Sequence, residues 1–305
     1  MGTSSADAAP TSASRDDSTS SLVSIICAYR DASHFIPGLI LNVQSQVYTD
    51  WELLLVDDCS RDDGPKFAKE ASLIDQRLRP ITAGPRPAGL PDGPWWPRNQ
   101  GLLHAYGSWI AFLDADDLWH PLKLQLQMTW HCKEKIDLSM SGFGRFRDAD
   151  QRIIAWRCPP ARVTYKQLLA GNLVPMLTVV VRRRLLRDGF RPVNHEDYLL
   201  WLDLFRDHPE IRIFVLPQLL AFYRLHQSNL SRRQLVALVW VYNVYKAHQL
   251  STPKSLMGVL LWLHYHARLA LARLIRPTRI RLDEAILCQK PRNCPFPAWW
   301  QFKGI

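Results

Sequence analysis

Three short apolar runs, each ending abruptly in polar or acidic residues, constrain the fold more than any other feature of this sequence. A continuous apolar run of this length is typical of a strand that is buried on both faces. Segments with apolar residues at helical spacing follow each run, so the order along the chain is 22–28, 35–46, 51–56, 67–74, 109–113 and 122–131. This alternation predicts an α/β fold with βαβ units and a mixed, mainly parallel sheet flanked by helices.

The residues that end these three runs form the candidate site. They are Tyr29-Arg-Asp31, Asp57-Asp-Cys-Ser60 and Asp114-Ala-Asp-Asp117. Ligands of open α/β sheets bind outside the carboxyl ends of the parallel strands. We therefore expect all three segments to meet at one edge of the sheet.

The second half of the chain has a more mixed pattern. Strands are expected at 138–146, 153–157, 177–181, 212–216 and 219–224, and helices at 196–205, 232–250 and 254–276. We expect residues 1–21 to be a disordered tail, because they contain almost no large apolar side chain. Residues 22–231 would then form the catalytic domain, and residues 232–305 a basic, apolar helical extension.

Asp114, Asp116 and Asp117 crowd three carboxylates into four positions after a buried strand. Packed carboxylates repel one another unless a cation or a proton lies between them. Mg²⁺ and Mn²⁺ are commonly held by one or two carboxylates together with substrate phosphates. The alternative is structural, with Asp116 or Asp117 as the N-cap of a helix that begins near Pro121.

The net charge of +10 lies entirely in the last quarter of the chain, where residues 232–305 hold 12 Lys and Arg against Asp283 and Glu284. A basic segment rich in Leu and Trp suits an anionic membrane surface. A solvated basic tail is the alternative, and no nucleic-acid recognition motif supports nucleic acid as the partner. In the helix expected at 254–276, two histidines and two arginines interrupt the apolar sequence, which favours a helix lying at the interface over one that spans.

The expected setting is cytoplasmic, at the inner face of a membrane. The first 20 residues lack the apolar core of a signal peptide. The six cysteines form no CxxC pair, which fits a reducing compartment.

Taken together, these motifs resemble glycosyltransferase family 2, whose members have the GT-A fold. The order and spacing of the motifs carry the resemblance, which covers about residues 22–231. The matching segments are Val23–Tyr29, Leu54–Ser60, Pro97–Gly101, Gly107–Trp119, His195–Leu202 and Tyr223–Ser231.

The resemblance implies a nucleotide-sugar site and a divalent cation, Mg²⁺ or Mn²⁺. Ala28, Tyr29 and Asp58 would hold the nucleobase. Arg98 would lie near the base or the phosphates, and Asp114 would face the ribose.

Asp116 would bind the metal, with Asp117 and His226 as further candidate ligands. Asp197, in the Glu196-Asp197 pair, would be the catalytic base. Each assignment has a bland alternative: Tyr29 as a wall of the core, Arg98 as a surface ion-pair partner, the Glu-Asp pair as acidic residues on a helix dipole, and His226 as a surface or core histidine.

The implied activity is inverting transfer of one sugar from a nucleotide diphosphate to a saccharide or lipid-linked acceptor, in the synthesis of cell-envelope polysaccharide, lipopolysaccharide or glycolipid. Asp58 favours a UDP donor first and a dTDP donor second, since uracil and thymine offer a ring N–H to a carboxylate. The Gln-x-x-Arg-Trp signature of processive members is absent. The segment 84–97 is longer and richer in Pro and Trp than the family pattern, so we expect a loop that borders the donor or the acceptor. The alternatives are a catalytically inactive relative acting as a membrane-associated partner and, ranked lower, a sugar nucleotidyltransferase.

Overall fold

The computed structural model describes residues 21–225, 234–275 and 280–286. The predicted tail at 1–20 therefore lies outside the described residues. The described chain forms one ten-stranded sheet in the order β10-β7-β6-β8-β4-β1-β2-β3, with β9 pairing both β6 and β5. The strands are β1 Val23–Tyr29, β2 Trp51–Asp57, β3 Leu78–Thr82, β4 Trp109–Phe112, β5 Leu118–Trp119, β6 Leu138–Arg147, β7 Arg152–Arg157, β8 Val180–Arg182, β9 Ile213–Leu225 and β10 Ile280–Arg281.

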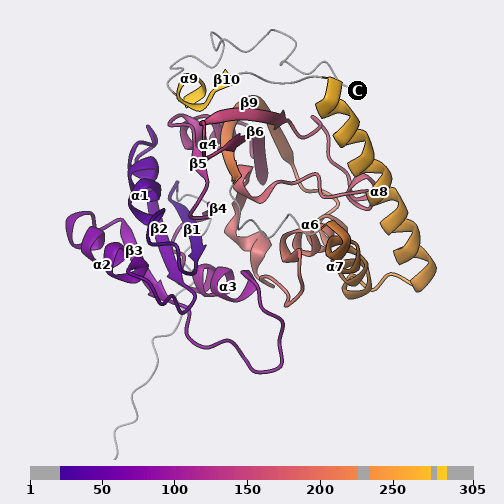
Figure 1. The fold of residues 1–305 in the computed structure, drawn as a ribbon, viewed down its shortest axis with the longest axis horizontal. Coiled ribbons are helices and arrows are strands. Elements are labelled where there is room, and N and C mark those ends of the chain that lie inside the picture. The colour runs from indigo at the N-terminus through magenta and orange to yellow at the C-terminus, as the bar shows by residue number, and fades with distance from the viewer. Residues whose placement is uncertain (1–20, 226–233, 276–279, 287–305) are drawn as a thin grey trace, which may run out of the picture.

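Helices cover the sheet and extend beyond it. They are α1 Ile36–Gln44, α2 Gly64–Ile74, α3 Trp95–His104, α4 Lys123–Glu134, α5 Tyr165–Leu168, α6 Glu196–Asp207, α7 Gln234–Ala247, α8 Thr252–Ile275 and α9 Leu282–Ile286, with 3-10 turns η1 Met176–Thr178 and η2 Arg183–Leu186. In Figure 1, α1 and α2 lie with β1–β3 at one end of the molecule, while α6, α7 and α8 gather at the other end.

The strands β1, β2, β3 and β4 form the parallel half of the sheet. Every residue of β2 and β4 is buried, and so is every residue of β1 except Ala28. Parallel sheets are covered on both faces, which is why these strands read as unbroken apolar runs in the sequence. The remaining strands pair antiparallel, except that β6 and β9 are parallel. The prediction of a mixed, mainly parallel α/β sheet is confirmed.

Some predicted boundaries are wrong. The segment expected as one strand at 177–181 divides into η1 and β8. The two strands expected at 212–216 and 219–224 are one strand, β9, whose pairing with β6 shifts register between Leu216 and Leu219. A bulge at this point accommodates Pro217, which has no N–H to donate to a ladder.

The sequence pattern did not predict β3 or α3. β3 is the edge strand, carries Pro80 and has only Leu78 buried, so it lacks an apolar run. The segment expected as a loop at 84–97 ends earlier, because α3 begins at Trp95 and includes Pro97 in its first turn, where a missing N–H costs nothing. Gly101 allows α3 to lie on β1, since a Cβ there would come within 2.5 Å of Ile26.

The first helix of the C-terminal segment is part of the core. Val241, Val244 and Tyr245 of α7 are fully buried in the cluster that contains α6. The Tyr245 hydroxyl shares a hydrogen bond of 2.9 Å with the Tyr198 hydroxyl and donates to the carbonyl of Leu169 at 2.9 Å. The domain boundary at residue 231 stays a prediction, but α7 packs as an integral layer against α6.

We expect Tyr245→Ala to lower the free energy of unfolding by about 3–5 kcal/mol, because it empties a fully buried aromatic site and removes one of the two hydrogen bonds of the Tyr198 hydroxyl, which also donates to the Leu168 carbonyl. Denaturant unfolding of the whole chain measures this. Val239→Ala, on the exposed face of the same helix, is the matched control and should change stability by less than about 0.5 kcal/mol. A transition unchanged by Tyr245→Ala would contradict the integration of α7 into the core.

Candidate functional site

The three polar segments do meet at the carboxyl edge of the parallel strands. β1 and β2 run in register so that Tyr29 lies beside Asp57. The Tyr29 carbonyl accepts a hydrogen bond of 2.8 Å from the Asp58 N–H, and the Asp31 carboxylate accepts one of 2.7 Å from the Arg61 N–H. Asp31 and Cys59 both have positive φ, at 50° and 60°. Backbone conformations of this kind cluster at binding sites, where the surrounding structure holds them.

Asp58, the predicted nucleobase ligand, is engaged by a neighbouring cation. The Arg30 guanidinium contacts the Asp58 carboxylate and also donates to the Asp58 carbonyl at 2.9 Å. Burial raises the pKa of Asp58, and the charge of Arg30 opposes that rise. Arg30 also donates to Asp92 at 3.1 Å, and Asp92 contacts Arg86. A nucleobase that bonds to Asp58 therefore meets Arg30 at the same carboxylate.

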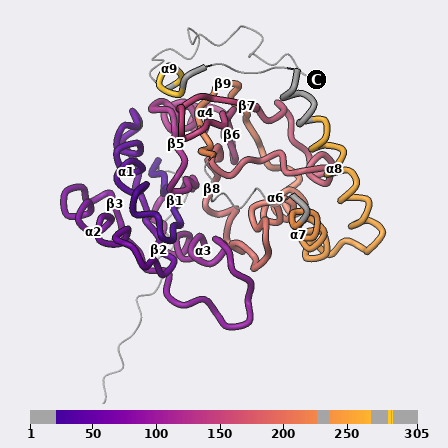
Figure 2. Tube along the Cα trace, in the orientation of Figure 1, coloured from indigo at the N-terminus to yellow at the C-terminus, as the bar shows by residue number. Residues whose placement is uncertain are grey.

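The segment that carries Asp92 and Arg86 is the long loop between β3 and α3, which reaches out from the body of the molecule in Figure 2. The indole N–H of Trp95 donates to the Pro91 carbonyl at 2.9 Å, and that of Trp96 donates to the Ala83 and Gly84 carbonyls at 3.1 Å. The loop is thus attached to α3 and to its own base through tryptophans, and to Arg30 through Asp92.

Tyr29 and Ala28 differ in what they offer a ligand. Tyr29 is only 4% exposed and packs in the core cluster beneath α1, with its ring against Gly64. Burial raises the pKa of Tyr29, with the charge of Asp57 adding to the effect. Ala28 is half-buried. Most of the Tyr29 side chain thus serves as a wall of the core.

The acidic turn after β4 presents its three carboxylates differently. Asp114 and Asp116 are half-buried, while Asp117 is 1% exposed. Asp117 accepts a hydrogen bond of 2.9 Å from the N–H of Arg224 in β9, and its Oδ2 has no hydrogen-bond partner. Burial, together with the charges of Asp116 and Asp114, raises the pKa of Asp117. The N-cap alternative is wrong, because α4 starts at Lys123 with Leu122 at its N-cap and no side-chain cap.

Arg98 joins this turn to the other half of the site. Its guanidinium donates to Asp114 at 2.8 Å and contacts Glu196 at the start of α6. Arg98 is buried, so the reading of it as a surface ion-pair partner is wrong. Burial acts to lower the pKa of Arg98, but the charges of Asp114 and Glu196 outweigh it and raise the pKa overall.

The two carboxylates at the start of α6 have separate environments. Glu196 is buried, and burial raises its pKa to about 7 against the opposing charge of Arg98. Asp197 is half-buried and accepts a hydrogen bond of 3.0 Å from the side-chain amide of Asn172. His195, immediately before them, has φ 59°. Glu196 therefore pairs with Arg98, and Asp197 is the more exposed of the two carboxylates.

Sequence reasoning assigned no individual role to several residues that arrange the site. They are Arg30, Asp92, Asn99 and Asn172. Asn99 fixes the approach to α6, since its amide donates to the Phe190 carbonyl at 2.8 Å and its carbonyl accepts from the Phe190 N–H at 2.7 Å. Each acts on a partner at least 25 positions away, so no local pattern signals it. His226 lies outside the described residues.

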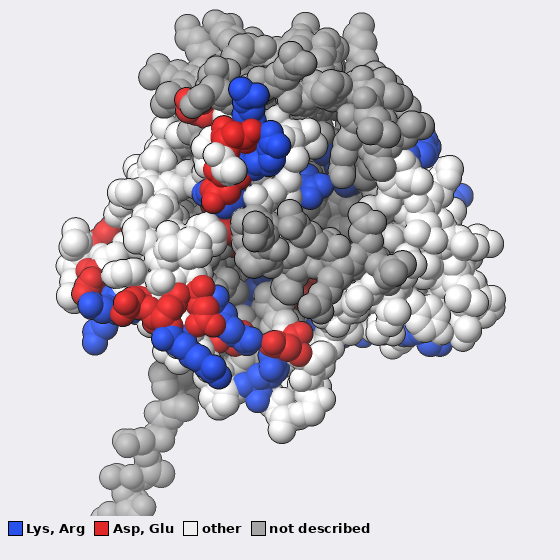
Figure 3. Space-filling view, viewed as in Figure 1, with Lys and Arg blue, Asp and Glu red and all other residues white. Residues whose placement is uncertain are grey.

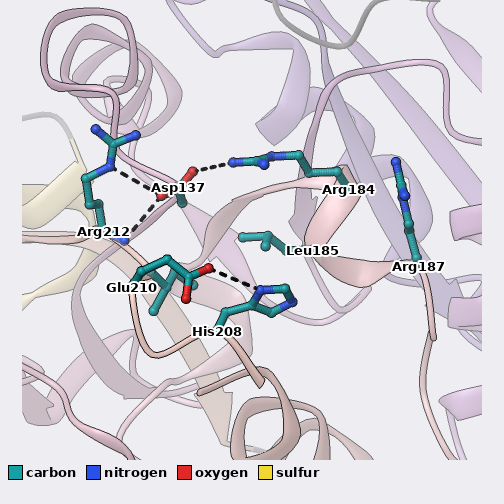
Figure 4. Close-up of a pocket in the computed structure, with 8 residues that line it drawn as sticks. Asp137, Arg184, Leu185, Arg187, His208, Glu210 and Arg212 are labelled. Carbon is teal, nitrogen blue, oxygen red and sulfur yellow. Dashed lines mark hydrogen bonds and ion pairs between the residues drawn. The ribbon is translucent and has the colours of Figure 1, made fainter. Parts of the chain in front are cut away.

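A pocket of about 620 Å³ lies at the opposite edge of the sheet, where β6 begins. Figure 4 shows Asp137 between two arginines of its lining, bonded to Arg184 at 2.9 Å and paired with Arg212 at 3.5 Å. Its lining includes none of the predicted site residues. These contacts hold the starts of β6 and β9 beside the end of β8, which is a structural role.

Comparison with known proteins decides the family. The model described as glycosyl transferase family 2 matches residues 24–174. An Escherichia coli protein, the UDP-Glc:alpha-D-GlcNAc-diphosphoundecaprenol beta-1,3-glucosyltransferase WfgD, is 34% identical over 219 residues, which cover 71% of this chain and 82% of that protein. This chain belongs to glycosyltransferase family 2. Another relative, the E. coli O-antigen biosynthesis glycosyltransferase WbnJ, is 25% identical over 70% of this chain and 84% of its own length.

Solved structures agree on the fold. Staphylococcus aureus TarS 1–349, in complex with UDP-GlcNAc, superposes with a TM-score of 0.60 at 18% identity, covering 80% of this chain and 72% of that one. The mannosyltransferase PcManGT from Pyrobaculum calidifontis, in complex with GDP-Man and Mn2+, gives a TM-score of 0.57 at 15% identity, covering 86% and 84%. The predicted family and GT-A fold are both confirmed for this family 2 glycosyltransferase.

We expect Arg98→Met to raise the pKa of Glu196 above about 7, because it removes the cation that opposes burial. Since a carboxyl with a raised native pKa loses stability as pH rises through that value, the destabilisation should be about 3–5 kcal/mol near pH 8 and smaller near pH 5.5. Denaturant unfolding at the two pH values measures it. Arg147→Met, which breaks an exposed ion pair of 2.6 Å with Asp150, is the control and should cost at most about 0.5 kcal/mol at either pH. An Arg98→Met cost that is equal at both pH values would contradict the coupling.

Proposed function

We propose that this family 2 glycosyltransferase is an inverting enzyme that transfers one sugar from a UDP-sugar to a lipid-linked acceptor. One observation carries the proposal. Arg98 binds Asp114 of the β4 turn and Glu196 of α6, and so places the nucleotide-side carboxylates next to Asp197. If the donor and the acceptor meet at this point, Asp114 lies on the donor side of the reacting bond and Asp197 lies on the acceptor side.

The donor side favours UDP. Asp58 would accept the ring N–H of uracil, with Ala28 and Tyr29 beside the base and Asp114 at the ribose. Arg98 would lie near the phosphates. The E. coli relative is named for UDP-glucose, and the S. aureus neighbour was crystallised with UDP-GlcNAc, which supports the same donor class here. Arg30 would release Asp58 or share it when the base enters.

The acceptor side rests on the relatives. The E. coli relative acts on a sugar linked to undecaprenol through a diphosphate, and a second is named for O-antigen biosynthesis. We propose an acceptor of the same class, a saccharide on a lipid diphosphate, used in cell-envelope polysaccharide synthesis at the cytoplasmic face of a membrane.

The acidic turn fits a divalent cation, Mg²⁺ or Mn²⁺. Within the described residues no group of three or more His, Cys, Asp and Glu side chains is placed to hold a metal by itself. A site completed by phosphate oxygens needs only one or two carboxylates. Asp116 would be the first ligand, while Asp117 offers an Oδ2 with no partner and a pKa raised by burial and by its acidic neighbours; His226 is a further candidate ligand. A bound cation would neutralise the negative charge that the departing diphosphate gains.

The chain's own residues would carry the transfer as a single displacement. Asp197 takes the proton from the acceptor hydroxyl while that oxygen forms its bond to the anomeric carbon. The bond from that carbon to the diphosphate breaks, and its electron pair leaves with the nucleotide. Asn172 holds the Asp197 carboxylate in place through its 3.0 Å hydrogen bond. Attack from the face opposite the leaving group inverts the anomeric configuration.

We expect Asp197→Asn to lower kcat by about two to four orders of magnitude, since general-base catalysis is worth about 10²–10⁴-fold. Asparagine keeps the size of the side chain but not its basicity, so UDP affinity should hardly change. Transfer from a UDP-sugar to a lipid-diphosphate acceptor is the assay. Glu196→Gln is the comparison variant, because it alters the neighbouring carboxyl that binds Arg98, and it should lower kcat less than Asp197→Asn does.

An active Asp197→Asn enzyme beside a dead Glu196→Gln enzyme would assign the base to Glu196 instead. A wild-type protein that binds UDP but transfers no sugar from a panel of UDP-sugars would favour the inactive, membrane-associated partner protein.

Calorimetry tests the nucleotide and the metal together. We expect UDP to bind more tightly than GDP, because the Asp58 pocket suits the smaller base. Mn²⁺ should strengthen UDP binding, and Asp116→Asn should remove that gain while the metal-free affinity stays the same. Asp150→Asn, which alters an exposed carboxylate paired with Arg147 outside the turn, should behave like the wild type. Tighter binding of GDP, or UDP binding indifferent to both Mn²⁺ and EDTA, would overturn these assignments.

A further inference from the structure

Helix α8 turns large apolar side chains outward, whereas an ordinary surface helix turns them toward the core. The side that faces the protein is formed by Ser255, Gly258, Val259, Trp262 and Tyr265, which are buried or half-buried. The side that faces outward carries five large apolar side chains that are 41–59% exposed: Leu256, Met257, Leu260, Leu261 and Leu263. A surface helix of a soluble protein turns its apolar stripe toward the core, so the outward apolar face needs another explanation.

The inward face is fully used, so α8 cannot turn its leucines to the core. Gly258 lies directly on the ring of Tyr245, where a Cβ would come within 2.7 Å of the ring. The Ser255 hydroxyl donates to the Ser251 carbonyl at 3.1 Å. Small side chains at these positions let α8 lie close to α7, and a leucine in their place would collide with it.

Charge identifies what the outward face meets. Lys254 and Arg268 are exposed near the two ends of this face, and residues 232–305 hold 12 Lys and Arg against two acidic residues. In Figure 3 the side of the molecule that carries α7 and α8 is largely uncharged, with Lys and Arg at its margin and no acidic side chain visible among its described atoms. An apolar strip bordered by cations complements a lipid bilayer with anionic headgroups.

None of the helices that the structure describes has both the length and the apolarity needed to cross a bilayer. We propose that α8 lies flat on an anionic bilayer, with the face Leu256-Met257-Leu260-Leu261-Leu263 inserted among the headgroups. Lys254 and Arg268 pair with lipid phosphates at its ends. The inference rests on the burial pattern of α8 and does not depend on the proposed sugar transfer.

This docking would place the site close to the lipid surface. On its inner side, the Tyr265 ring packs on Gly171, where a Cβ would lie 2.7 Å from it. The neighbouring residue is Asn172, whose carbonyl accepts from Arg157 at 3.2 Å and whose amide binds Asp197 at 3.0 Å. One layer of side chains therefore separates the membrane-facing helix from the residue that holds Asp197.

Vesicle co-sedimentation of the full chain tests the proposal. The wild type should bind vesicles that contain phosphatidylglycerol, bind phosphatidylcholine vesicles weakly, and be released by salt as screening removes the charge contribution. Leu256→Gln/Leu260→Gln should lower partitioning roughly tenfold or more, since both side chains would leave water on docking. The matched control is Leu73→Gln/Ile74→Gln on α2, whose side chains are 81% and 89% exposed at the other end of the molecule. It should bind like the wild type.

Equal loss in the α2 control, or no binding of the wild type to phosphatidylglycerol vesicles, would overturn the proposal. A dimer in sedimentation equilibrium that Leu256→Gln/Leu260→Gln dissociates, without vesicle binding, would make this face a contact between two copies of the chain. Met257→Gln/Leu261→Gln is the second variant should the first melt at a lower temperature than the wild type. Unchanged vesicle binding in that second, folded variant would also contradict the proposal.

Discussion

The buried guanidinium of Arg98 is the interaction on which the rest of the site depends. A cation removed from water is stable only when its charge is matched, and here Asp114 and Glu196 match it from two different elements. The next residue, Asn99, forms two hydrogen bonds with Phe190 before α6. Helix α3 thus joins the β4 turn to the start of α6, and the proposed nucleotide side and the proposed acceptor side of the site become one unit.

The sequence predicted the parts of the fold and the site that local patterns encode. Strands β1, β2 and β4 are buried on both faces, so each reads as an apolar run that ends where a polar loop begins. Because these strands are parallel, their carboxyl ends lie at the same edge of the sheet, and this alone predicts that Asp58 and Asp114 lie at that edge. Family resemblance added Arg98 and Asp197, which no periodicity identifies.

Long-range contacts account for what the sequence did not predict. The bonds Arg30–Asp92 and Asn172–Asp197 join residues that are far apart in the sequence and come together only in the folded chain. Glu196 and Asp197 are adjacent in sequence, yet the contact with Arg98 gives them different roles. The sequence showed that α8 is rich in apolar residues, but not which side of the helix faces the protein. Gly258 decides that side, because it fits against the Tyr245 ring where a leucine would not.

The stereochemistry of the transferred sugar tests the central claim most directly. The enzyme, Mn²⁺, an α-linked UDP-sugar and a lipid-diphosphate acceptor would be incubated, and the anomeric configuration of the new linkage would be read by proton NMR. Displacement with Asp197 as base predicts a β-linked product and free UDP in equal amounts. An α-linked product would contradict the account, because a carboxylate that only removes a proton from the acceptor cannot retain the configuration of the donor.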